Sequence, residues 1–394
     1  MTERIYRVLA TRQRSMVEEL GAYVSVESGS RDKPGVDRAG RLAAEALAAI
    51  GFAVETMPQP SCGDHLVARR AGGGRGRLLA LLHLDTVWPP GTLVDNPFRV
   101  EDGRAYGPGV LDMKGGWVVL FSALRALGEM EWDGLATTTV FLCGDEELGS
   151  PTGRAGIERE AQRADWTLVM EPARENGAFV VQRGMVGALS LEVSGITAHT
   201  TAAERGASAI HALAHKVLEL EDLTDPPRGT IVTVGIVAGG SARQVIPDRA
   251  TASVDVRART AGDAEELLRR IRIIAEAPHV PGTSARLGGG ITRPAFERTA
   301  GGERLLRLAQ ARGREIGLAL DGAATQTGSD GNFTAALGIP TLDGLGAEGG
   351  HACSRNEFVL VESLPRRAAL LAGLIAELPA SDTTRREWRM ARLR

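Results

Sequence analysis

The sequence has few of the residues that build disulfide frameworks or membrane spans. It contains three cysteines in 394 residues, and none of them stands in a CxxC pair, which fits a reducing compartment. No stretch approaches the roughly 20 apolar residues that a membrane-spanning helix needs. The N-terminal segment lacks the uninterrupted apolar core and small-residue cleavage site of a signal peptide. We therefore expect a cytoplasmic protein that does not contact membranes.

An excess of charge and nucleotide-binding loops are also absent. The formal net charge is −3, and a chain so close to neutrality gives no bulk signal for binding nucleic acid or an anionic membrane. The sequence has no GxGxxG after the first predicted strand and no GxxxxGK[ST] loop, so nothing favours a nucleotide or redox enzyme. The hydrophobic fraction of 43% is ample for a sizeable core. At roughly 100–200 residues per domain, the length predicts two or three domains.

Predicted strands and helices alternate in the first and last parts of the chain. The nearly continuous apolar run at 77–85 is typical of a strand that is buried on both faces. The alternation predicts an α/β domain with a mixed sheet between helices, formed by residues 1–186 and 297–394. Residues 187–296 show half-exposed strands in the order β-α-β-β-α-β, which predicts an inserted α+β domain of the ferredoxin-like open-sandwich type. The basic stretch 381–394 is predicted to be a solvated tail.

Acidic and histidine side chains follow the predicted strands of the α/β domain. His83 and Asp85 are two residues apart in LLHLD, so they share one side of a strand. Asp112 is surrounded by glycines in GPGVLDMKGG, and Glu146 and Glu147 end the acidic run of FLCGDEELGS. Each segment alone also fits a structural histidine, a capped turn or a solvated acidic turn. Closely packed like charges raise one another's pKa unless a cation neutralises them, which favours a metal site.

Two further side chains complete a set of possible metal ligands. Glu171 stands at the end of another predicted strand, and His351 lies in a glycine-flanked loop late in the chain. Ligands in α/β domains gather at the carboxyl edge of the sheet. Histidine and carboxylate without cysteine suit zinc, manganese or cobalt, and two ions sharing a bridging carboxylate would use all of these groups. The sequence therefore predicts a two-metal site.

The order of these motifs resembles that of the di-zinc aminoacylase and carboxypeptidase family of metallopeptidases, nearest its glutamate carboxypeptidase branch. The resemblance covers nearly the whole chain, from HLDTV through GPGVLDMKGG, GDEELGS, MEP, GITAHT, DVR, TRPAF and TGSDGNF to GGHACSRNE. It implies a hydrolase that cleaves an amide or peptide bond next to a free carboxylate in a small peptide or N-acyl amino acid. It also implies two Zn²⁺ per chain, with Co²⁺ or Mn²⁺ as alternatives, and a bridging water.

The resemblance implies roles for individual residues of the α/β domain. The implied metal ligands are His83 and Glu171 for one zinc, Glu147 and His351 for the other, and Asp112 as the bridge between them. Asp85 would orient His83, and Glu146 would act as the general base without touching a metal. The peptide bond after Asp112 would be cis.

The inserted domain would serve as a lid and as the surface through which a homodimer forms. His199 in GITAHT would reach into the partner subunit's active site and stabilise the oxyanion. Arg257 and Arg293 would hold the substrate carboxylate, a role that suits the bidentate pairing of arginine. The remaining implied substrate contacts are Gln244, Thr327 and Gly328.

Three features depart from the usual pattern of the glutamate carboxypeptidase branch. Gln244 lies where that branch usually has an asparagine before the turn, and Thr327 replaces a glycine. No lysine follows Glu171 at the place where the glutamate-specific relative has one. These departures weaken the expectation of a glutamate preference, so an N-acyl-amino-acid deacylase or a dipeptidase of the same family is the main alternative. A non-catalytic binding protein is disfavoured, because the ligands and Glu146 are all present.

Overall fold

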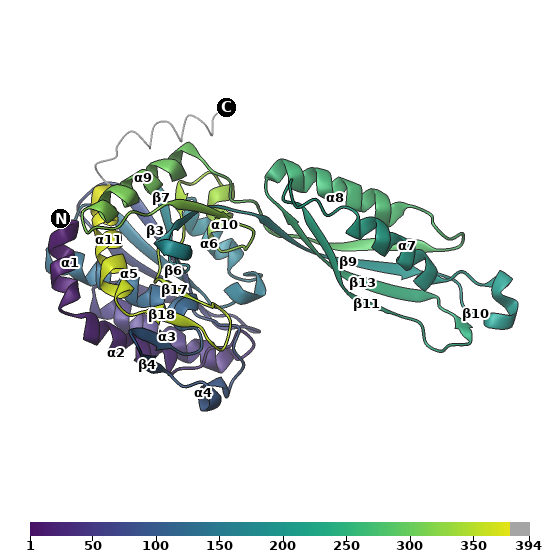
Figure 1. Cartoon of the computed structure of the whole chain (residues 1–394), viewed down its shortest axis with the longest axis horizontal. Coiled ribbons are helices and arrows are strands. Elements are labelled where there is room, and N and C mark those ends of the chain that lie inside the picture. The colour runs from purple at the N-terminus through teal and green to yellow at the C-terminus, as the bar shows by residue number, and fades with distance from the viewer. Residues whose placement is uncertain (379–394) are drawn as a thin grey trace. The chain divides into compact units, whose positions relative to one another are not determined.

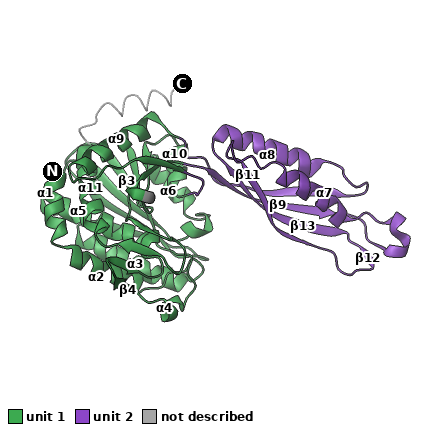
Figure 2. Cartoon of the chain, viewed as in Figure 1, with its two compact units in different colours: residues 1–182, 298–324, 329–394 green, residues 183–297, 325–328 purple. Residues whose placement is uncertain are grey.

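The computed structural model describes residues 1–378, and the chain divides into two compact units (Figure 2). Unit 1 is formed by residues 1–182, 298–324 and from 329 onward, and unit 2 by residues 183–297 and 325–328. The predicted basic tail at 381–394 lies outside the described residues. Among the described helices, none is both long enough and apolar enough to cross a membrane.

Unit 1 is built on a six-stranded mixed sheet with the order β1-β2-β6-β3-β7-β16. β2 pairs antiparallel with β1 and β6, whereas β6, β3, β7 and β16 pair in parallel. The central strands are buried along nearly their whole length, because their residues are apolar on both faces. The strands are β1 Ala53–Met57, β2 His65–Ala71, β3 Arg77–His83, β6 Thr137–Cys143, β7 Trp166–Val169 and β16 Thr341–Leu342.

Helices cover both faces of this sheet, which confirms the predicted α/β class (Figure 1). In β2, Leu66 and Ala68 join the larger hydrophobic core, whereas Val67 joins the smaller core on the other face, as the alternation of strand side chains requires. The larger core is covered by α1 Thr2–Ala10, α2 Gln13–Val24, α3 Lys33–Ala49, α5 Gly115–Glu129, α9 Ala300–Arg314 and α11 Ser363–Glu377. The smaller core contacts α6 Arg154–Ala161 and α10 Gly331–Ala336.

Short strands and helices lie in the segments that connect the longer elements of unit 1. A second sheet has the order β17-β18-β5-β4, and β15 pairs with β8. These strands are β4 Arg99–Glu101, β5 Arg104–Tyr106, β8 Phe179–Arg183, β15 Gly322–Thr325, β17 Gly349–Gly350 and β18 Phe358–Leu360. The short helices are α4 Thr92–Asp95, η1 Val110–Lys114, η2 Glu146–Leu148 and η3 Glu175–Gly177. η1 and η2 stand next to the candidate site.

Unit 2 is the open sandwich that the sequence predicted. Its antiparallel sheet has the order β11-β13-β9-β14, and α7 Ala209–Glu221 and α8 Ala261–Glu276 share one core with it. Burial alternates along the strands, so residues such as Leu189 and Val254 pack under the helices. The strands are β9 Met185–Ser194, β11 Ile231–Gly239, β13 Arg249–Ala258 and β14 Ser284–Arg293. A separate pair is formed by β10 Ala198–His199 and β12 Val245–Ile246, and η4 Thr200–Arg205 follows β10.

Candidate functional site

Three candidate metal ligands converge at one edge of the main sheet. His83 ends β3, Asp112 lies in η1, and Glu147 lies in η2, shortly after β6. Their ligand atoms lie within 4.8 Å of one another. This convergence follows from the parallel pairing of β3 and β6, which places His83 opposite Cys143 and ends both strands at the same edge.

Glu171 joins the same edge from the next strand. It follows β7, which pairs in parallel with β3, and its Oε1 lies 3.8 Å from Nε2 of His83. The same Nε2 atom lies 3.1 Å from Oδ1 of Asp112. His83 and Glu171 are buried, and Asp112 is partly buried. One imidazole nitrogen therefore faces two carboxylates, which is the arrangement that a bound cation would stabilise.

Glu147 shows that the donor set fits a cation. Its Oε1 is buried and has no hydrogen-bond partner among the described residues. Burial, followed by the charge of Asp112, raises the pKa of Glu147 to about 9. A buried oxygen without a partner costs about 1–3 kcal/mol, and a divalent ion would both satisfy it and keep the carboxylate ionised. The residues present therefore fit a metal centre.

Asp85 holds the site in two ways. Its backbone carbonyl accepts a hydrogen bond from Nδ1 of His83 at 2.8 Å, while its carboxylate Oδ1 is 3.5 Å from the same nitrogen. The carboxylate accepts hydrogen bonds from the N–H groups of Glu146 and Glu147 at 3.0 and 3.2 Å. Burial opposes protonation of His83, but hydrogen bonds to Asp112 and Asp85 raise its pKa well above the ordinary value. Asp85 thus orients His83 mainly through its backbone, and its carboxylate fixes the turn of η2.

Glu357 fixes the backbone of the central ligand, a role that the sequence reasoning missed. Its Oε1 accepts hydrogen bonds from the N–H groups of Leu111 and Asp112 at 2.8 and 2.9 Å. Its Oε2 accepts one from the indole of Trp88 at 3.4 Å. Burial raises the pKa of Glu357 to about 7. The peptide bond after Asp112 is cis, as the family resemblance implied.

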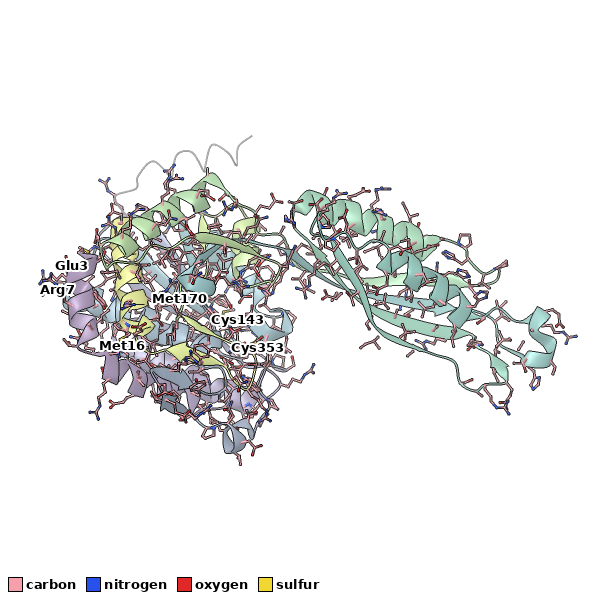
Figure 3. All side chains as sticks on the ribbon, in the orientation of Figure 1. Glu3, Arg7, Met16, Cys143, Met170 and Cys353 are labelled. Carbon is pink, nitrogen blue, oxygen red and sulfur yellow. The ribbon has the colours of Figure 1, made fainter. Side chains whose placement is uncertain are left out.

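The loop between β17 and β18 contributes a thiol to the site, which the sequence reasoning also missed. Sγ of Cys353, labelled in Figure 3, lies 3.6 Å from Oδ2 of Asp112. Burial and the neighbouring carboxylates raise the pKa of this thiol, so it stays protonated and can donate. The predicted ligand His351 is exposed in the same loop, its ring 6.0 Å from that of Phe358, and it does not belong to the group of three converging ligands.

A second buried group of ligand types, His65, Cys143 and Asp145, is a hydrogen-bond network. Nδ1 of His65 accepts from a backbone N–H, so its Nε2 donates to Oγ1 of Thr152 at 3.0 Å. Thr152 in turn donates twice to Asp145, at 2.8 and 2.7 Å, and Cys143 donates to it at 3.1 Å. Burial lowers the pKa of His65, which keeps it neutral. Because these groups already have partners, we interpret the network as a support for the turn that carries Glu146.

A cavity of about 290 Å³ lies beside Glu147. Its walls are residues 29–32, residues 86–90 and Leu148, with Val87, Trp88 and two prolines as the apolar part. Backbone hydrogen bonds join the two loops, from Ser30 to Thr86 at 3.0 Å and from Thr86 to Ser28 at 2.8 Å. Its size and partly apolar lining suit part of a small molecule.

In unit 2, the predicted substrate contact Arg257 and the predicted catalytic residue His199 have local partners. Arg257 on β13 makes two hydrogen bonds to the carboxylate of Asp255, at 2.7 and 3.0 Å. His199 is exposed, and its Nδ1 lies 2.8 Å from Oγ1 of Thr201. The side chain of Gln244 is exposed as well. The local hydrogen bonds of Arg257 use Nε and Nη2, and those of His199 use Nδ1.

The other predicted substrate contacts gather where residues 325–328 join unit 2. Arg293 is 5% exposed, and a Cβ atom at Gly328 would come within 2.4 Å of its Cδ, so the glycine leaves room for the arginine. Oγ1 of Thr327 accepts a hydrogen bond from Arg183 at 3.1 Å. The structure therefore brings Arg293, Thr327 and Gly328 together, and it adds Arg183 to them.

Comparisons with known proteins show the family of the chain. A family model described as peptidase family M20/M25/M40 matches residues 80–377. Carboxypeptidase G2 from Pseudomonas sp. (strain RS-16) is 31% identical over 384 residues, covering 95% of this chain and 92% of the relative. Succinyl-diaminopimelate desuccinylase from Xanthomonas campestris pv. campestris (strain B100) is 30% identical over 360 residues, covering 86% of this chain and 92% of the relative.

Solved structures share the fold at lower identity. A tripeptidase from Staphylococcus aureus has a TM-score of 0.77 at 20% identity, with coverage of 94% of this chain and 99% of that chain. Aminopeptidase PepT from Bacillus cereus ATCC 10987 has a TM-score of 0.75 at 22% identity, with coverage of 93% and 98%. As the ordered sequence motifs predicted, the chain belongs to peptidase family M20/M25/M40 and is a metal-dependent peptidase or amidohydrolase.

Proposed function

We propose that the enzyme hydrolyses an amide or peptide bond next to a free carboxylate in small peptides or N-acyl amino acids, using two divalent metal ions, with zinc as the first candidate. The observation that carries the proposal is the convergence of His83, Asp112 and Glu147 around a buried oxygen of Glu147 that has no partner among the described residues. Family membership supplies the hydrolytic class.

The chain offers a ligand set for two ions. His83 and Glu171 would hold one, Glu147 and His351 the other, and Asp112 would be shared. When bound, the ions supply Lewis acidity that activates a water molecule and polarises the scissile carbonyl. The proposed role of His351 rests on its sequence motif. The other four side chains also lie close together: His83, Glu147 and Glu171 at the ends of adjacent strands, and Asp112 in η1.

Glu146 is the proposed general base. It is 9% exposed and precedes Glu147 on the same turn, whose backbone Asp85 holds through two hydrogen bonds. A carboxylate fixed beside a metal ligand is placed to accept a proton from the attacking water and to deliver it to the leaving amine. The network around Asp145 keeps this turn in place.

Unit 2 is proposed to bind the substrate carboxylate and a second copy of the chain. Arg257 and Arg293 would pair with the carboxylate, and His199 would stabilise the oxyanion in the partner subunit's site. β11 is one of the two edge strands of its sheet, and Ile236 and Val237 on it are 65% and 55% exposed. An apolar edge strand of this kind is suited to pairing with an identical strand, which supports a homodimer through unit 2.

A substrate panel tests the proposal. Zinc-loaded enzyme is assayed with N-acetyl and N-succinyl amino acids, dipeptides and C-terminal glutamyl conjugates, each as the free acid and as the matched C-terminal amide. We expect hydrolysis of the free acids and at least about tenfold slower hydrolysis of the amides, since the arginines lose a charge-assisted bond. Equal rates for acids and amides would overturn the carboxylate claim. The preferred acyl group distinguishes a carboxypeptidase from a deacylase or dipeptidase.

A further inference from the structure

Three of the seven histidines of the chain meet on the surface of unit 2. His211 and His215 stand one helical turn apart on α7, both exposed, and their Nε2 atoms lie 3.2 Å from each other. The ring of His279, after the end of α8, stacks on His215 with 5.3 Å between centroids and an interplanar angle of 10°. The proposed reaction uses none of these side chains.

The spacing of the two Nε2 atoms suits a single metal ion. Histidines at positions i and i+4 on one helical face are the pair that binds zinc in HExxH helices. With Zn–N bonds of about 2.0–2.1 Å and tetrahedral angles, two ligand nitrogens lie about 3.3 Å apart. The observed 3.2 Å is close to this value. We propose that His211 and His215 bind a divalent transition metal ion, such as Zn²⁺, Cu²⁺ or Ni²⁺, at a site separate from the catalytic ligands.

Glu219 is the proposed third ligand. It follows His215 by one further turn of α7, and its side chain is 45% exposed. In the structure its Oε1 pairs with Nε2 of His279 at 2.7 Å. A rotation of this exposed side chain brings its charge toward the histidine pair. Two imidazoles and one carboxylate, with water completing the shell, form a nitrogen and oxygen donor set that suits these ions.

The scaffold beneath the pair is fixed by a buried lysine. Nζ of Lys216 donates to three carbonyls at the end of α8, those of Ile274, Ala275 and Ala277, at 2.9, 3.0 and 2.7 Å. This links α7 to α8 without using His211 or His215. Nζ of Lys216 also lies 3.4 Å from Nδ1 of His279, so the positive charge of the lysine lies beside the ring of His279. The pair of imidazoles therefore projects from a helix that is already held in place.

The test is a metal titration of the full-length enzyme already loaded with its catalytic zinc. Calorimetry with further Zn²⁺ should show one additional site in the wild type. His211→Ala or His215→Ala should weaken that site at least about tenfold, and the double variant should lack it, with hydrolysis unchanged in all three. Glu219→Gln should weaken it less, and Glu221→Gln, the same charge change on another face of α7, should leave it unchanged.

A second readout keeps the test independent of activity. Cu²⁺ added to the zinc-loaded wild type should give an electron paramagnetic resonance spectrum with coupling to two nitrogens, and the double variant should not. Extra Zn²⁺ should raise the melting temperature of the wild type alone. No additional site in the wild type, or the same site in the double variant, would overturn the proposal. Because both histidines are exposed, the variants are expected to fold, and circular dichroism checks this.

Discussion

Units 1 and 2 present their candidate site residues in opposite ways. In unit 1, His83, Asp112 and Glu147 converge at the edge of a sheet, and Glu147 keeps a buried oxygen without a partner among the described residues. In unit 2, Arg257 pairs with the carboxylate of Asp255 through two hydrogen bonds. We infer that the proposed metal centre is pre-organised, whereas the proposed substrate contact Arg257 already has a local partner. Changes in unit 1 should therefore affect turnover and metal content, and changes in unit 2 should affect substrate affinity.

Glu146→Gln should produce the largest effect. The amide keeps the size of the side chain but cannot accept the proton, so kcat should fall by about 10²–10⁴-fold. Metal content should stay normal, because the four converging ligands remain. Rates of hydrolysis and metal analysis on the same sample check this. A variant that turns over at the wild-type rate would show that another group is the base.

Glu147→Gln should separate the ligand from the base on the same turn. Loss of one anionic donor should weaken metal binding by about 10–100-fold or more, measured by competition with a chelator. Activity should then recover as the metal concentration is raised, which should not happen in Glu146→Gln. If Glu147→Gln retained metal as the wild type does, the proposed ligand set would be wrong.

The metal affinity of unit 1 should rise with pH. The pKa of Glu147 in the metal-free chain is raised to about 9, so at pH 7 it holds a proton that the metal must displace. Affinity for the ion that Glu147 binds should increase by at least about tenfold per pH unit between about 5 and 9, because binding releases this proton, and binding at His83, whose pKa is also raised, releases a further one. The metal-free protein should also lose stability over the same range, since the folded state binds the proton more tightly than the unfolded state does.

Calorimetry in two buffers with different heats of ionisation measures the released protons, and Glu147→Gln is the control. Metal binding by Glu147→Gln should release fewer protons at pH 7 than metal binding by the wild type. Equal proton release in the two proteins would show that Glu147 is already ionised without metal. That result would contradict a site in which Glu147 holds a proton before the metal binds.

Arg257→Ala in unit 2 should have the smallest effect. Loss of the charge-assisted hydrogen bonds between Arg257 and the substrate carboxylate should raise KM by about 5–20-fold for substrates with a free carboxylate. The value of kcat should change little. Asp255→Asn should instead lower KM, because it weakens the local ion pair of Arg257. A fall in kcat with unchanged KM in Arg257→Ala would contradict the division of roles between the units.

The sequence predicted those features that depend on local pattern. His83, Glu147 and Glu171 could be placed together because each follows a strand of one sheet, and parallel pairing brings strand ends to one edge. The contact between Glu357 and Asp112 could not be predicted, since 245 positions separate them and chain packing alone joins them. The role of the Asp85 carboxylate was missed for the same reason. Residues 325–328 belong to unit 2 through contacts that no periodicity in the sequence shows.

Metal stoichiometry tests the central claim most directly. The protein is prepared as the double variant His211→Ala and His215→Ala, so that the proposed surface site does not contribute to the count. Plasma mass spectrometry of this variant, after exchange into zinc and removal of loosely bound ions, should give two zinc ions per chain together with full activity. One zinc ion per chain at full activity would contradict the shared-ligand centre proposed for His83, Asp112, Glu147, Glu171 and His351.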